Sequence, residues 1–128
     1  MFSLLGFDVK GDIWKFLDFV SSKNKPKTME EFVKLTTYED NGQYLIAMLQ
    51  WEFRILCQIK YAMNNNVSTS KLRVNPYVLS KSIPKARHFT WEELKNLVQQ
   101  LFYLDRSIKS GDIDEKTGLV LYLQNIKG

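Results

Sequence analysis

The sequence predicts an all-α fold, a compact bundle of about five or six helices, and three observations support this. Apolar residues recur at three- and four-residue steps in several segments of the 128-residue chain. Helix-start signals precede most of these segments, and no segment shows the sustained alternation of a β-strand. Hydrophobic residues make up 45% of the chain, which is enough for one core at this length. We therefore expect a single helical domain over residues 1–128.

The first 41 residues are expected to form a leading segment with short helices and a connection. Gly11 and Asp12 open a helix whose apolar residues have helical spacing: Ile13, Phe16, Leu17 and Val20. The polar residues 21–27 then predict a flexible connection. Thr28 and Glu31 have the spacing of a capping box, so a second short helix should begin there. A turn at residues 40–42 leads into a helical core over residues 42–128.

The central helix of this core is predicted over residues 43–63. This stretch is apolar on nearly every helical face, and its only charged residues are Glu52, Arg54 and Lys60. Such a helix needs other helices around it. Asparagines end it at residues 64–66, and residues 68–72 form at most one turn. A further helix should begin near Pro76, because proline is favoured in a first helical turn.

Two more helices are predicted in the last third of the chain. Thr90 and Glu93 form a capping box, and Gly111 supplies a permissive residue just past the end of the helix that follows. The apolar stripe of that helix is continuous: Leu94, Leu97, Val98, Leu101, Leu104 and Ile108. Asp114 can cap a final helix. The apolar face of this last helix carries Leu119, Tyr122, Leu123 and Ile126.

Arg54 is the only cation in the densely apolar part of the central helix, so we expect it to be paired. Asp105, at the edge of an apolar stripe, is the acid we expect, and an ion pair between Arg54 and Asp105 would join the two long helices. The alternative is a pair within one helix. Asp105 precedes Lys109 by four residues, in the acid-first order that favours such a contact.

Several short motifs follow one another along the chain. They are Trp51, Phe53, Arg54, Leu56 and Ile59 in the central helix, then NPYV at residues 75–78, ARHF at 86–89, and LDR at 104–106 with Lys109 and Gly111. In order and spacing they resemble the C-terminal helical domain of the delta subunit of bacterial DNA polymerase III, the part of the clamp loader that forms its collar. Residues 2–5 and 13–17 look like the segment that precedes this domain in the family. Residues 20–41 are longer than the family's usual connection, and Pro84 lies where the family runs an unbroken helix.

The resemblance implies a non-catalytic oligomerisation domain within a subunit of the DNA polymerase III holoenzyme. In that family the collar domain assembles with the C-terminal domains of gamma/tau-type and delta-prime-type subunits, so that the sliding clamp is loaded on primed DNA during replication. The domain would contact DNA only within the assembled complex. The family's AAA+-like module lies in a region absent from this sequence, so we expect the chain to be a fragment of a cytoplasmic protein.

Catalytic and cofactor chemistry has few residues to use in this sequence. One histidine and one cysteine, with no carboxylate pair near them, do not supply a zinc site, because even a catalytic zinc needs three protein ligands. His88 is better explained as a helix-end residue that caps carbonyls or packs on an aromatic ring. The chain has no glycine-rich phosphate loop followed by lysine and serine or threonine. It has no apolar run of transmembrane length either. We therefore expect no catalytic residue, metal, cofactor, small-molecule substrate or membrane partner.

The charge distribution supports an alternative. The formal net charge is +4, and the excess lies after residue 66. No acid interrupts a set of five basic residues: Lys71, Arg73, Lys81, Lys85 and Arg87. Two short helices here would also describe a helix-turn-helix DNA-binding regulator with salt-dependent affinity for a duplex. Pro84 counts against a recognition helix, and a cluster this small is more often a solvated face. A third hypothesis is an unrelated helical adaptor.

Overall fold

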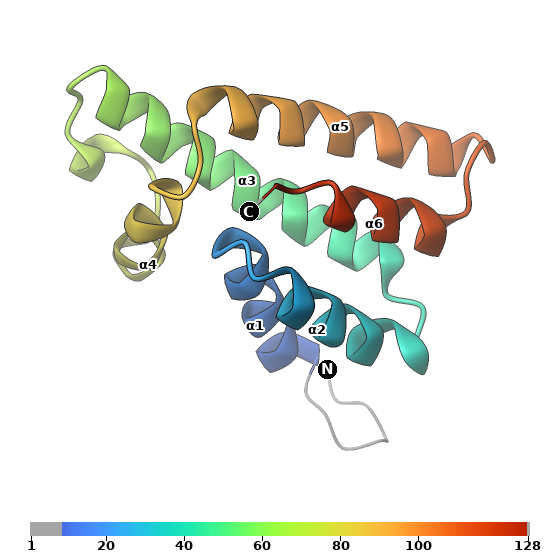
Figure 1. The fold of residues 1–128 in the computed structure, drawn as a ribbon. Coiled ribbons are helices and arrows are strands. Elements are labelled where there is room, and N and C mark those ends of the chain that lie inside the picture. The colour runs from blue at the N-terminus through green and yellow to red at the C-terminus, as the bar shows by residue number, and fades with distance from the viewer. Residues whose placement is uncertain (1–8, 128) are drawn as a thin grey trace.

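The computed structural model describes residues 9–127. Over this range the chain forms six α-helices, one short 3-10 helix and no strand, which confirms the predicted all-α bundle (Figure 1). The elements are α1 (Val9–Ser21), α2 (Lys25–Thr37), α3 (Gly42–Asn64), η1 (Thr69–Lys71), α4 (Pro76–Ala86), α5 (Trp91–Lys109) and α6 (Glu115–Gln124). The motif at residues 2–5 lies outside the described residues. None of the described helices is long and apolar enough to cross a membrane.

α3 is the central helix of the bundle, as the sequence predicts. It packs against α5 and α4, α1 packs mainly on α2, and α6 lies against α5, α2 and α3 (Figure 1). All four apolar residues predicted on α1 are buried. One continuous core takes residues from every α-helix, among them Phe16, Phe32, Phe53, Ala86, Leu101 and Tyr122. The core therefore extends through both the leading segment and the rest of the chain.

The start of α2 differs from the prediction. The helix begins one turn before Thr28, because Asn24 is its cap and accepts a hydrogen bond from the amide three residues on at 3.2 Å. Thr28 instead donates its hydroxyl to the Asn24 carbonyl at 2.8 Å. Pro26 fits the first turn, where an amide has no partner within the helix. The connection is consequently a short one over residues 22–24, and the predicted flexible stretch over residues 21–27 is wrong.

Asparagines shape the path from α3 to α4. α3 ends at Asn64, and Asn66 adopts a φ of 56°, a left-handed conformation that asparagine tolerates better than most residues. Asn75 caps α4, because its Oδ1 accepts from two of the backbone amides that follow, at 2.9 Å and 3.4 Å. Pro84 lies inside α4, and the helix ends shortly after it. Because Pro84 has no amide hydrogen, it cannot donate to the carbonyl of Ser80 four residues earlier, and only two residues of α4 follow it.

The predicted helix ends around α5 and α6 are confirmed. The Thr90 hydroxyl accepts from the Glu93 amide at 3.1 Å, and the Glu93 carboxylate accepts from the Thr90 amide at 2.8 Å, which completes the capping box. Gly111 has a φ of 81°, which a residue without a side chain adopts at little cost. The Asp114 carboxylate accepts from the Thr117 amide at 3.0 Å and caps α6.

Two contacts fix α6 on α5. Gly118 allows the helices to approach closely, because a Cβ atom at this position would lie 2.5 Å from a methyl carbon of Leu104. The buried Tyr122 hydroxyl donates a hydrogen bond to the Leu97 carbonyl at 2.8 Å. Burial also raises the pKa of Tyr122 above its ordinary value, so this phenol stays protonated as a donor.

Replacing Tyr122 by phenylalanine should lower the free energy of unfolding by about 1–2 kcal/mol, because the buried Leu97 carbonyl loses a donor while the ring packing is kept. Urea unfolding followed by circular dichroism measures this change. The control is Tyr103→Phe, the same substitution at an exposed ring, which should change the free energy by less than about 0.5 kcal/mol. Equal effects of the two substitutions would contradict the role of this hydrogen bond.

Candidate protein-interaction site

A partly buried polar network joins α1, α3 and α4. The Lys85 ammonium lies 2.7 Å from an Asp18 carboxylate oxygen and 3.0 Å from Glu52 Oε2. The Ser21 hydroxyl donates to the same Glu52 oxygen at 2.8 Å, and Lys81 lies 3.7 Å from Asp18. Glu52 is only 2% exposed, so its charge depends on these partners for compensation.

The position of Lys85 affects its protonation. Burial disfavours the charged ammonium, but the nearby carboxylates of Glu52 and Asp18 outweigh this and raise the pKa of Lys85 above its ordinary value. The ammonium therefore stays charged at neutral pH and holds the C-terminal part of α4 against α1 and α3.

The five basic residues of the predicted basic face have different surroundings. Lys81 and Lys85 meet the acids Asp18 and Glu52, which come from α1 and α3. The other three are exposed: Lys71, Arg73 and Arg87. The segment that lacks acids in the sequence is therefore partly neutralised in space. The five residues therefore do not form one uniform basic face.

Asp105 is paired within its own helix. Its Oδ2 atom lies 2.9 Å from the Lys109 ammonium, while among the described residues Arg54 forms no ion pair with it. α3 and α5 are antiparallel, and Tyr61 of α3 packs against Trp91 of α5 with ring centroids 6.1 Å apart (Figure 1). From this contact, Asp105 lies roughly 20 Å along α5, whereas Arg54 lies roughly 10 Å along α3. The two residues are therefore offset along the helix axes, and the predicted interhelical pair does not form.

His88 has the structural role that the sequence predicts. Its Nδ1 atom lies 2.9 Å from the carbonyl oxygen of Ser21, the last residue of α1. The same corner contains Lys23, whose ammonium is 2.9 Å from Glu93 and 4.7 Å from the Phe89 ring centroid. The hydrogen bonds from Lys23 and the Thr90 amide lower the pKa of Glu93. These groups therefore tie the end of α1 to the start of α5.

α5 carries an aromatic pair on its outward side. Phe102 and Tyr103 are both exposed, and their ring centroids lie 6.0 Å apart in an edge-to-face arrangement. The Arg106 guanidinium lies 5.9 Å from the Phe102 centroid. We call these three residues the α5 aromatic face. Exposed aromatic side chains beside an arginine are typical of residues that anchor protein interfaces.

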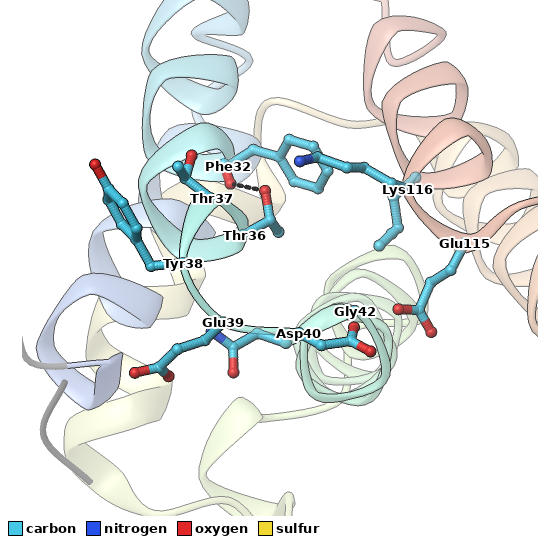
Figure 2. Close-up of a pocket in the computed structure, with 11 residues that line it drawn as sticks. Phe32, Thr36, Thr37, Tyr38, Glu39, Asp40, Gly42, Glu115 and Lys116 are labelled. Atoms are coloured by element: carbon cyan, nitrogen blue, oxygen red, sulfur yellow. Dashed lines mark hydrogen bonds between the residues drawn. The ribbon is translucent and has the colours of Figure 1, made fainter. Parts of the chain in front are cut away.

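A cavity of about 310 Å³ lies between the end of α2 and the start of α6. Figure 2 shows Phe32, Thr36 and Tyr38 on one side and Glu115 and Lys116 on the other, with Glu39, Asp40 and Gly42 below them. The described part of the chain holds no group of three or more acidic, histidine or cysteine side chains that could bind a metal, here or elsewhere. Gln43 donates to Glu115 at 2.9 Å, so this region joins α3 to α6.

The sequence predictions had missed the α5 aromatic face and the partners of Lys85. Phe102 and Tyr103 lie outside the apolar stripe of their helix, and this position in the sequence could have indicated that their rings are exposed. In the folded chain, most charged groups near the core are paired between helices or within one helix, and exposed aromatic residues remain outside. These features define a small helical domain with an exposed aromatic face on α5.

The comparisons with known proteins identify the family. The sequence model of the DNA polymerase III delta subunit, C-terminal domain, matches residues 10–126, and the chain belongs to this family. It is 23% identical over 124 residues to DNA polymerase III subunit delta of Bacillus subtilis (strain 168), covering 94% of this chain and 36% of that protein. The resemblance that the motifs predict is thereby confirmed, and these matches give no support to a helix-turn-helix regulator.

A solved structure shows the same fold. The Bacillus subtilis DNA clamp loader delta protein superposes with a TM-score of 0.81 at 23% identity, over 96% of this chain and 38% of that one. The chain therefore spans little more than a third of the length of the relatives that it matches.

Proposed function

We propose that this domain acts by associating with other clamp-loader subunits and carries out no chemistry of its own. The observation that carries the proposal is the family match over residues 10–126. The partners would be the C-terminal domains of gamma/tau-type and delta-prime-type subunits. Together they would form the collar that lets the DNA polymerase III holoenzyme load its sliding clamp on primed DNA in the cytoplasm.

The α5 aromatic face supports this proposal. Its two exposed rings would be removed from water in a side-to-side contact between helices, and Arg106 could pair with an acid of the neighbouring subunit. Lys71 and Arg87 remain exposed for DNA contact within the assembled complex.

Mixing this chain with the C-terminal domains of the two other subunit types from the same source should give a new stoichiometric species. Light scattering after size-exclusion chromatography at moderate salt measures its mass. Phe102→Ala combined with Tyr103→Ala should weaken assembly by at least about tenfold, because central aromatic residues dominate interface energies. The control is Tyr38→Ala, at an exposed ring near the end of α2, which should assemble normally.

Two other results would each reject the proposal. A stable dimer of this chain that shifts with duplex DNA and joins no other subunit would favour the helix-turn-helix alternative. A monomer that binds neither the subunits nor DNA would favour an unrelated helical adaptor.

A further inference from the structure

A groove runs between α1, α3 and α4, on elements other than the one that carries the α5 aromatic face. It consists of two adjoining cavities of about 380 Å³ and about 290 Å³, which share Trp51 and Val78 in their lining. We call it the tryptophan groove. It is defined by six residues of these helices and of the segment before α4: Trp14, Trp51, Arg54, Arg73, Tyr77 and Val78.

Aromatic side chains form the walls of the larger cavity. Trp14 is 45% exposed and Tyr77 is 70% exposed, although both are large rings that usually contribute to a core. Trp14 packs edge-on against Trp51 with ring centroids 5.5 Å apart, so the two rings support each other. An apolar side chain that entered here would contact rings that are already in place, so little conformational entropy would be lost.

The charges of the groove are distributed unevenly. In the larger cavity the acids Asp18 and Glu52 are matched by Lys81 and Lys85. In the smaller cavity Arg54 and the exposed Arg73 have no acid beside them among the described lining residues, and neither forms an ion pair with a described residue. Two guanidinium groups at one end of an apolar cavity are complementary to carboxylates, which arginine binds with two parallel hydrogen bonds.

A peptide fits this arrangement better than a nucleic acid does. A single strand needs a track of cations along its backbone, whereas here the cations without an acid partner lie at one end. At the other end the acids Asp18 and Glu52 are paired with Lys81 and Lys85, so that end offers the phosphates of a strand no unpaired cation. An apolar side chain followed by acidic residues meets neither obstacle.

We propose that the tryptophan groove binds an acidic segment of a partner protein. An aromatic or aliphatic side chain of the segment enters the cavity beside Trp14 and Tyr77, and its carboxylates pair with Arg54 and Arg73. This binding site is separate from the collar contact proposed above and does not depend on it. It would give the domain a means of recruiting a further protein to the complex.

Random peptides displayed on phage and selected on this chain provide the test. Enriched peptides, resynthesised with fluorescein, should carry acidic residues next to an aromatic or aliphatic residue and should bind more weakly as salt is raised. Trp14→Ala and Arg54→Glu should each weaken binding by at least about tenfold. The matched controls are Tyr38→Ala and Lys95→Glu, at exposed residues outside the groove, and they should bind as the unaltered chain does. Urea unfolding of each variant confirms that it is folded.

Three results would overturn the proposal. The first is a selection that enriches no peptide, or only peptides without acidic residues. Enriched peptides that bind the two groove variants as well as the unaltered chain would count equally against the proposal. The second is binding of a labelled oligothymidylate that the Trp14→Ala substitution abolishes, which would make the groove a nucleic-acid site. Loss of subunit assembly in both groove variants, without any peptide binding to the unaltered chain, would make it part of the collar contact.

Discussion

Replacing Phe53 by alanine should lower the free energy of unfolding by about 3–5 kcal/mol. Phe53 is fully buried on α3, the helix around which the others pack, and its ring meets that of Phe89 edge to face with centroids 5.9 Å apart. The substitution removes the transfer free energy of the ring and leaves a cavity that the surrounding helices only partly fill. Urea unfolding should show a lower midpoint with an unchanged slope.

The control for Phe53→Ala is Tyr44→Ala, which removes a ring from the same helix at a partly exposed position. It should lower the free energy of unfolding by less than about 1 kcal/mol. If the two variants were equally destabilised, the core would not be centred on this face of α3.

The structure confirms the features that short stretches of sequence specify. The capping box of Thr90 and Glu93, the cap at Asp114 and the left-handed Gly111 each depend on a few neighbouring residues, so their spacing is enough to predict them. The start of α2 was misplaced because Asn24 and Thr28 can both begin a helix. Pro26 in the first turn and the burial of Thr28 favour Asn24, and burial is not visible in a short polar stretch.

Contacts between distant segments were the harder part of the candidate site. Between Lys71 and Arg87 the sequence has no acid, yet the fold brings Asp18 and Glu52 to the lysines of α4 from two other helices. The predicted ion pair of Arg54 with Asp105 was wrong for a related reason, because predicting it correctly requires knowing how far α3 and α5 are offset along each other. Helical spacing predicts which side of a helix is buried, but it does not predict how far two helices are shifted along each other.

The polar network around Lys85 and the tryptophan groove share residues. Asp18, Glu52 and Lys85 line the larger cavity of the groove, and their contacts hold together the three helices that form its walls. A change at Lys85 should therefore affect both the stability of the fold and the shape of the groove.

Replacing Lys85 by methionine should lower the free energy of unfolding by about 3 kcal/mol, because Glu52 would be left buried with only the Ser21 hydroxyl as a described partner. Lys85 is itself only 16% exposed in its side chain, so water can compensate little of the loss. The control is Lys27→Met, which removes one partner of an exposed pair with Glu30 and should cost less than about 0.5 kcal/mol.

The double variant Glu52→Gln with Lys85→Met tests whether the cost comes from the unpaired charge. Because both charges are then removed together, we expect its free energy of unfolding to lie within about 1 kcal/mol of the unaltered chain. A double variant as unstable as Lys85→Met alone would show instead that the lost contact of Lys85 with Asp18 is responsible, because methionine keeps most of the packing of the lysine stem.

The pH dependence gives a second measure of the same network. The pKa of Lys85 is raised in the folded state above its ordinary value of 10.5, so the folded chain holds this proton more tightly than the unfolded chain does. The resulting stabilisation is fully present below pH 10.5 and is lost as the pH rises through the folded pKa. The unaltered chain should therefore lose more stability than Lys85→Met when urea unfolding is repeated at increasing pH above 10.5, and parallel losses in the two proteins would contradict the role of the Lys85 proton.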